Sequence, residues 1–183
     1  MSNAKSVLEG VVAEGFVSVR DAGLTGMVTV RADLSDAATI AALASCAITV
    51  PGVRQLSDGV AWMAPDELLL ITEYDAAPAL ALKVQAAMVE THALVHVVSD
   101  ARAVLRVEGA GVKEALAKVC PVDLATLLPG EVRRTRLAQV AAALWLDDAQ
   151  TAHIICFRSV ADYVFGALEM SSRDGSEVGV FTS

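Results

Sequence analysis

The sequence predicts an α+β fold, in which two strand–helix units make one compact domain. Three observations support this prediction. Segments that alternate apolar and polar residues are interspersed with segments of helical periodicity. This succession of strands and helices occurs twice, between residues 27 and 98 and again between residues 102 and 168. No low-complexity linker separates the two halves, so we expect them to share an interface.

The chain divides into four expected segments. Residues 1–25 form an N-terminal segment that is partly loose, and residues 26–98 form the first α+β unit. Residues 99–170 form the second unit. Residues 171–183 form a polar C-terminal tail, in which residues 178–181 have the composition of an edge strand.

The first unit is expected to contain strands and helices in the order strand, helix, strand, strand, helix, strand. They lie at residues 27–32, 36–47, 59–63, 67–72, 79–90 and 93–98. Ser35 is the expected N-cap of the first helix, and Asp36 complements the positive end of its dipole. Pro65-Asp66 is a typical turn pair between the two central strands.

The second unit is expected to begin with a strand over residues 102–108 and a helix that stops at Pro121. Residues 132–146 are too many for one strand and predict a hairpin that turns around 138–140. A strand over residues 152–157 follows. Ser159 is the expected N-cap of a last helix. The residues expected on the inner face of that helix are Val160, Tyr163, Val164, Ala167 and Leu168.

Composition and charge restrict the class of protein. Hydrophobic residues make up 55% of the 183 residues and mean hydropathy is +0.53, which favours an apolar surface kept for a partner. The net charge of −8 argues against nucleic acid as a partner. No apolar stretch approaches the ~20 residues that span a bilayer, and the N-terminus has no secretory pattern. We therefore expect a cytoplasmic protein with no membrane partner.

The cysteines and histidines give no convincing active site. Cys46, Cys120 and Cys156 are widely spaced, which is typical of free thiols in a reducing cytoplasm. His92 precedes an expected strand and His96 lies within it, where a separation of four residues is ~13 Å and too long for one zinc ion. We therefore expect no catalytic residue and no metal site in this chain.

Gly109-Ala110-Gly111 follows a strand and precedes a helix, as a dinucleotide-binding loop does. The full motif fails because Glu114 stands where close approach to a pyrophosphate is needed. We interpret the segment as a tight turn between a strand and a helix.

Four charged residues are the remaining candidates for a site. Asp100 lies between two strands, where its carboxylate either caps a turn or holds a ligand amine or pterin-type ring. Arg133, Arg134 and Arg136 cluster in an otherwise acidic chain. They form an interface with acidic groups of another subunit, a solvated strand face, or an anion site.

Several segments in order resemble the gamma subunit family of heterotetrameric sarcosine oxidases. They are the region Trp62–Asp66, SDARAVLRV from Ser99, CPVDL from Cys120, Pro129-Gly130, RTRLAQV from Arg134 and RSVADY from Arg158. The resemblance extends from about residue 27 to residue 168. Leu68 departs from it, since the family commonly has a tryptophan-like position there.

The resemblance implies a bacterial protein with the fold of the folate-binding aminomethyltransferase of glycine cleavage, the T-protein. It also implies a four-subunit oxidoreductase of sarcosine catabolism, which converts sarcosine to glycine, forms H2O2 and passes the one-carbon unit to tetrahydrofolate. FAD, FMN, NAD, tetrahydrofolate and zinc are implied on the alpha, beta and delta subunits. This chain is then a structural subunit that binds no cofactor tightly.

Two other functions stay open. A stand-alone folate-binding or folate-dependent one-carbon transfer protein would use Asp100 for the pterin, and Arg134 and Arg136 for the glutamate tail. The other alternative is a scaffold for another flavin dehydrogenase, which differs from the gamma subunit only in the identity of its partner.

Overall fold

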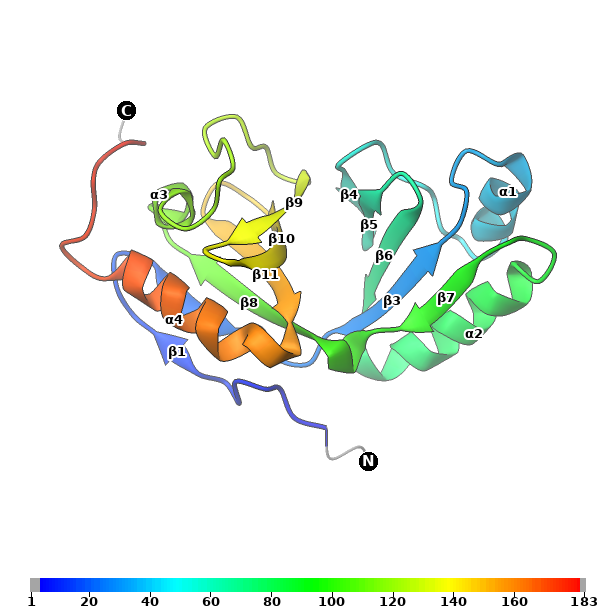
Figure 1. The fold of residues 1–183 in the computed structure, drawn as a ribbon, viewed down its shortest axis with the longest axis horizontal. Helices are drawn as coiled ribbons and strands as arrows, with labels where there is room; N and C mark the ends of the chain where they lie inside the picture. Colours follow the sequence, from blue (N-terminus) through cyan, green and yellow to red (C-terminus); the bar gives the residue numbers. More distant parts are fainter. Residues whose placement is uncertain (1–3, 182–183) are drawn as a thin grey trace. The chain divides into compact units, whose positions relative to one another are not determined.

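The computed structural model describes residues 4–181, which form two compact units. One unit consists of residues 25–100, and the other combines the N-terminal residues up to Leu24 with the chain from Ala101 onward. Each unit has one antiparallel sheet covered by helices on one face, as Figure 1 shows. The predicted α+β class is therefore confirmed.

The sheet of unit 25–100 has the strand order β4-β5-β6-β3-β7. Its strands are β3 (Gly26–Arg31), β4 (Leu56–Ser57), β5 (Val60–Ala64), β6 (Glu67–Thr72) and β7 (Leu94–Val97). The helices are α1 (Ala37–Ser45) and α2 (Ala77–Ala87), and a 3-10 turn at Tyr74–Ala76 precedes α2. All four strands predicted in this unit are present, and β4 is an addition.

Alternation along the central strands places one set of their apolar residues against the helices. Val28 and Val30 of β3, with Leu68 and Leu70 of β6, point to the same face and contact the helix layer. Leu43 of α1 and Val84 of α2 are both fully buried in that core. Burial of such side chains is the main stabilising contribution to this unit.

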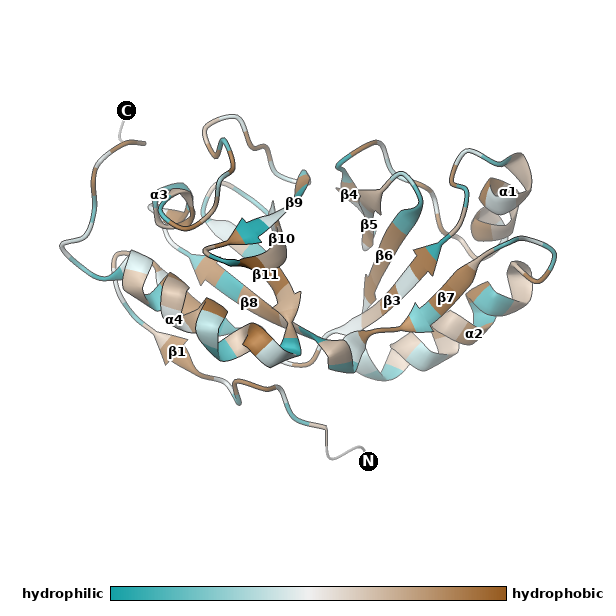
Figure 2. Cartoon of the chain, viewed as in Figure 1, coloured by the Kyte–Doolittle hydropathy of each residue, from teal (hydrophilic) through white to brown (hydrophobic). Residues whose placement is uncertain are grey.

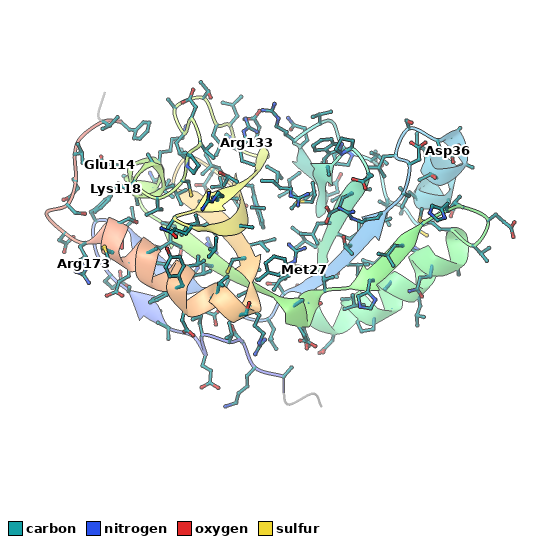
Figure 3. All side chains as sticks on the ribbon, viewed as in Figure 1. Met27, Asp36, Glu114, Lys118, Arg133 and Arg173 are labelled. Carbon is teal, nitrogen blue, oxygen red and sulfur yellow. The ribbon has the colours of Figure 1, made fainter. Side chains whose placement is uncertain are left out.

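The first helix is capped by Asp36 and not by the expected Ser35. The Asp36 carboxylate accepts hydrogen bonds from Thr39 N at 2.9 Å and Thr39 Oγ1 at 3.1 Å. These bonds lower the pKa of Asp36. Ser35 instead donates from its backbone and hydroxyl to Asp33, one turn before the helix. Figure 3 labels Asp36 at the start of α1.

The sheet of the other unit has the strand order β1-β2-β8-β11-β10-β9. Its strands are β1 (Val12–Ala13), β2 (Ser18–Asp21), β8 (Arg102–Glu108), β9 (Val132–Leu137), β10 (Val140–Leu146) and β11 (Thr151–Phe157). The helices are α3 (Val112–Ala117) and α4 (Ala161–Ser172). The predicted hairpin is β9-β10, whose turn residue Ala138 has φ 48°.

The N-terminal segment is more ordered than the expected partly loose residues 1–25. β2 pairs antiparallel with the C-terminal half of β8, and Val19 lies opposite Val107 with both side chains buried in the core. The segment therefore completes the sheet of residues 101–181, and the unit boundary lies near residue 24.

The last helix differs from its prediction at both ends. The chain enters α4 through a 3-10 turn at Arg158–Val160, so Ser159 is not its N-cap. Val164 and Leu168 are fully buried as expected, whereas Tyr163 is exposed. The helix continues through Ser172 into the expected tail, and residues 173–181 contain no strand.

The tail is attached to helix α3 by two oppositely charged side chains. The buried carboxylate of Glu114 accepts hydrogen bonds from Val178 N and Gly179 N. Lys118 Nζ donates to Ser171 O at 3.0 Å and to Ser176 O at 2.6 Å. Figure 3 labels Glu114 and Lys118 next to each other at α3.

Candidate functional site

The three predicted arginines lie on β9, which is the edge strand of its sheet among the described residues. Arg133 is half-buried, and its guanidinium donates to Glu131 Oε2 at 3.0 Å and to Val132 O at 3.2 Å. Arg134 and Arg136 are exposed on the other face of the strand. Arg136 donates to Gln139 O at 3.2 Å. Figure 3 labels Arg133 at this edge.

Asp100 lies in a short 3-10 turn, Ser99–Ala101, after β7. Its carboxylate is exposed and accepts a hydrogen bond of 2.7 Å from Tyr74 Oη. The adjacent Ser99 is buried, and its Oγ accepts from Met27 N at 2.9 Å. The Ser-Asp pair therefore ties this turn to β3 and to the turn before α2. Asp100 belongs to unit 25–100 and the three arginines to the other unit.

Sequence reasoning missed a row of polar side chains across four strands of the larger sheet. The register places Arg20 of β2 opposite Arg106 of β8, His153 of β11 opposite Arg106, and Trp145 of β10 opposite His153. All four side chains therefore lie on one face of the sheet, opposite to the face on which Leu105 and Ile154 contact the helices. No local pattern could have found this row, because its members come from four distant segments.

Two carboxylates connect the members of the row. Arg20 Nε and Arg106 Nη2 each lie 2.8 Å from the carboxylate of Glu108. Trp145 Nε1 donates to Asp147 Oδ1 at 2.9 Å, and His153 Nε2 lies 2.9 Å from Asp147 Oδ2. The rings of Trp145 and His153 stack with their centroids 5.1 Å apart. These contacts hold neighbouring strands together.

Burial sets the protonation of the groups that could act as nucleophile or base. Desolvation lowers the pKa of His153, against the opposing effect of Asp147. Burial raises the pKa of the Cys120 thiol to about 12 and that of Cys156 to about 11. All three cysteines are buried free thiols, as predicted. Cys120 and Cys156 are therefore protonated, weakly nucleophilic thiols at neutral pH.

The predicted tight turn Gly109–Gly111 packs against the segment before β2. A Cβ atom at Gly109, whose φ is +140°, would lie 3.0 Å from Val17 Cγ1. A Cβ atom at Gly111 would lie 2.5 Å from the Phe16 ring. Close packing of the N-terminal segment accounts for both glycines.

Unit 25–100 has an open cavity of about 560 Å³ at one end of its sheet. Arg31, Asp33, Asp66 and His92 line it together with the apolar residues Ala32 and Leu94. Arg31 pairs there with Glu67 at 3.0 Å and with Asp66 at 3.5 Å. Within residues 4–181, no group of three His, Cys, Asp or Glu side chains is placed to hold a metal ion. No helix in the same range has the length and apolar character to cross a membrane.

Comparison with known proteins identifies relatives of the chain. The model of the sarcosine oxidase gamma subunit family matches residues 31–174. A chain of the heterotetrameric sarcosine oxidase from Corynebacterium sp. U-96, in complex with pyrrole 2-carboxylate, is 26% identical and superposes with a TM-score of 0.78. That alignment covers 88% of this chain and 87% of the other. No curated protein matches it in sequence.

A second solved structure shows the fold. The glycine cleavage system aminomethyltransferase T from Bartonella henselae has a TM-score of 0.63 at 13% identity, over 84% of this chain and 45% of the aminomethyltransferase. The expected resemblance to the T-protein fold is therefore confirmed.

Proposed function

Because this chain belongs to the sarcosine oxidase gamma subunit family, we propose that it is the non-catalytic gamma subunit of a heterotetrameric sarcosine oxidase. The observation that carries the proposal is the family match over residues 31–174. The 26% identical chain in a heterotetrameric sarcosine oxidase supports it. In the proposed complex, sarcosine, oxygen and tetrahydrofolate are converted to glycine, H2O2 and methylene-tetrahydrofolate.

We propose a role in assembly, with FAD, FMN, NAD, tetrahydrofolate and zinc held by the alpha, beta and delta subunits. The protonated thiols of Cys120 and Cys156 support this role because neither is ready to attack a substrate. The carboxylates of Glu108 and Asp147 support it as well, since each already bridges side chains of this sheet. A purified chain that is yellow, or that makes peroxide from sarcosine without partners, would contradict the proposal.

The exposed arginines of β9 are the proposed electrostatic contact with acidic groups of a partner subunit. Changing both Arg134→Glu and Arg136→Glu should leave the chain folded, because both side chains are exposed. The association rate with the alpha, beta and delta subunits should fall by about tenfold or more at low salt, and by less at high salt. Co-purification and stopped-flow association at two salt concentrations measure this effect.

A matched control changes the same amount of charge elsewhere. The double variant Arg54→Glu and Arg173→Glu replaces two exposed arginines outside β9 and should assemble as the wild type does. Equal assembly of the Arg134/Arg136 variant and the wild type at both salt concentrations would show that β9 is an ordinary solvated edge strand and not a contact with a partner subunit.

The stand-alone folate-binding function remains testable on the isolated chain. Calorimetric titration with tetrahydrofolate should give no saturable heat if the chain has a role in assembly alone. Saturable binding that Asp100→Asn weakens would favour the folate function, because Asp100 is the proposed partner of the pterin ring. Tyr74→Phe removes the hydroxyl that donates to Asp100 and serves as the control for loss of the turn.

A further inference from the structure

The helix layer of unit 25–100 carries very little charge on its outer side. Helix α1 contains no charged residue, and Lys83 is the one charged residue of α2. A helix that faces water normally has a polar stripe opposite its buried stripe. Figure 2 shows tan to brown, apolar colour along most of α1 and pale to tan colour along much of α2.

The outer face of α2 is an apolar stripe that continues past its last turn. Ala79, Leu82, Ala86 and Val89 follow one another at helical spacing and are exposed. The exposed fraction is 67% for Leu82 and 75% for Val89. Opposite them, Ala81, Val84 and Met88 are buried in the core. The helix is therefore apolar on both sides, which is typical of a helix with a second contact.

Helix α1 packs beside α2 and widens the apolar surface. Lys83 Nζ donates to Cys46 O at 3.1 Å, and Cys46 Sγ donates to Lys83 O at 3.7 Å. The single charge of the layer is therefore directed to the junction of the two helices. On α1, Ile40 is 43% exposed, and the neighbouring Ala37, Ala41 and Ala44 are exposed.

Helix α4 of the other unit shows the usual polar pattern. Asp162 and Glu169 lie on its outer side, and Glu169 pairs with Arg173 one turn later at 3.9 Å. Its exposed apolar residues, Tyr163 and Met170, are interspersed with these charges. The charge-poor outer side of α1 and α2 is therefore a particular feature of unit 25–100.

Acidic residues lie at the ends of the helix layer. Residues 25–100 contain nine Asp or Glu and three Lys or Arg, so this unit carries a net charge of −6 out of −8 for the whole chain. Asp36 at the start of α1, Asp75 before α2 and Glu90 after it are all exposed. A binding partner that covers the layer thus meets an apolar centre with negative edges.

We propose that the outer faces of α1 and α2 dock an apolar surface of another subunit, rimmed by lysine or arginine. The inference rests on the proposed function and adds the chemistry of the partner. A second copy that docks through its own α1 and α2 fits poorly, because its acidic edges would repel these. The α2 stripe is also only about 15 Å long and 10 Å wide, roughly 150 Å², whereas a stable interface covers ~800 Å² on each partner. The partner therefore also has to cover α1 and the surface around the two helices.

The test replaces the two large side chains of the stripe without adding charge. Leu82→Gln with Val89→Gln keeps helix-compatible residues at exposed positions, so the chain should fold. The apparent Kd for the alpha, beta and delta subunits should rise by about tenfold or more, because two side chains that the proposed interface buries are lost. Tyr163→Gln with Met170→Gln, also exposed and seven residues apart on one helix, is the matched control and should assemble normally.

The outcomes separate the inference from the proposed function. A wild-type chain that does not assemble with those subunits overturns the proposed function and the inference with it. Normal assembly of the Leu82/Val89 variant, or equal loss in the control, overturns the inference alone. A wild-type chain that forms a stable dimer, which the Leu82/Val89 variant abolishes, assigns the surface to a second copy and also overturns it.

A charged pair of variants tests the chemistry of the partner's rim. Leu82→Arg with Val89→Arg should weaken assembly more than Leu82→Glu with Val89→Glu, because a basic rim repels arginine. Raising the salt concentration should reduce the difference between the two variants. A larger loss with glutamate would overturn the assignment of a basic rim.

Discussion

At the residue scale, individual carboxylates connect distant segments of this chain. Glu108 contacts two arginines on neighbouring strands, and Asp147 contacts both Trp145 and His153. Glu114 joins a helix to a tail more than sixty residues away. In each case the partners come from distant parts of the sequence, so the role of the carboxylate depends on the fold.

His153 should make stability depend on pH near neutrality. Burial lowers its pKa in the folded state below the usual 6.5, so the unfolded chain binds the proton more readily. The free energy of unfolding should therefore be constant above the unfolded pKa and fall as pH decreases through 6.5 toward the folded pKa. Thermal melts across this window should show the slope in the wild type and lose it in His153→Gln. An unchanged slope in the variant would assign it to other groups.

Glu114 should hold the C-terminal tail in place. Glu114→Ala removes a buried charged acceptor of the Val178 and Gly179 amides, and should cost about 1.5–3 kcal/mol. Urea unfolding measures this cost, and limited proteolysis after residue 172 should become faster. Glu114→Gln keeps one acceptor oxygen and should lie between the variant and the wild type. Equal proteolysis of all three would show that Lys118 alone anchors the tail.

At the scale of elements, the contact between the N-terminal segment and α4 depends on one glycine. A Cβ atom at Gly15 would lie 2.0 Å from Ser172 O, and the next residue, Phe16, donates from its backbone to the same oxygen at 3.0 Å. Helix α4 contains a second glycine, Gly166, where a Cβ atom would meet nothing within 4 Å. Alanine should therefore have opposite effects at the two positions.

Gly15→Ala should destabilise the protein by about 1–3 kcal/mol, because backbone atoms have to move apart. Gly166→Ala should stabilise it by about 0.5–1 kcal/mol, since alanine is the better helix former at an open position. Chemical unfolding of both variants measures the two signs. A stabilising Gly15→Ala would show that the N-terminal segment does not pack against α4 in solution.

The elements that were predicted well are those whose signal is local. The apolar runs at β6 and β8, and the hairpin length of residues 132–146, led to correct strands. β2 was missed because Ser18–Asp21 is short and polar at both ends, and its pairing with β8 depends on residues some ninety positions away. Ser35 was preferred over Asp36 as a cap because both have the right chemistry and they are adjacent in the sequence.

At the scale of the whole molecule, charge and apolar surface are divided between the two units. The acidic unit 25–100 carries the apolar outer faces of α1 and α2, and the other unit carries the arginines of β9. The two proposed contacts therefore test different parts of the same assembly. The expected apolar surface for a partner was inferred from composition, but composition contained no information on which helices expose it.

The sequence by itself determined the α+β class, most strands and helices, and the family resemblance. Periodicity and short motifs are local properties, so they can be recognised directly from the order of the residues. The tertiary structure alone decided that the N-terminal segment joins the second sheet, that Arg20, Arg106, His153 and Trp145 form one row, and that Leu82 and Val89 stay exposed. These features depend on strand register and on which side of α2, a helix that is apolar on both sides, meets the core. Both are set by packing between distant segments.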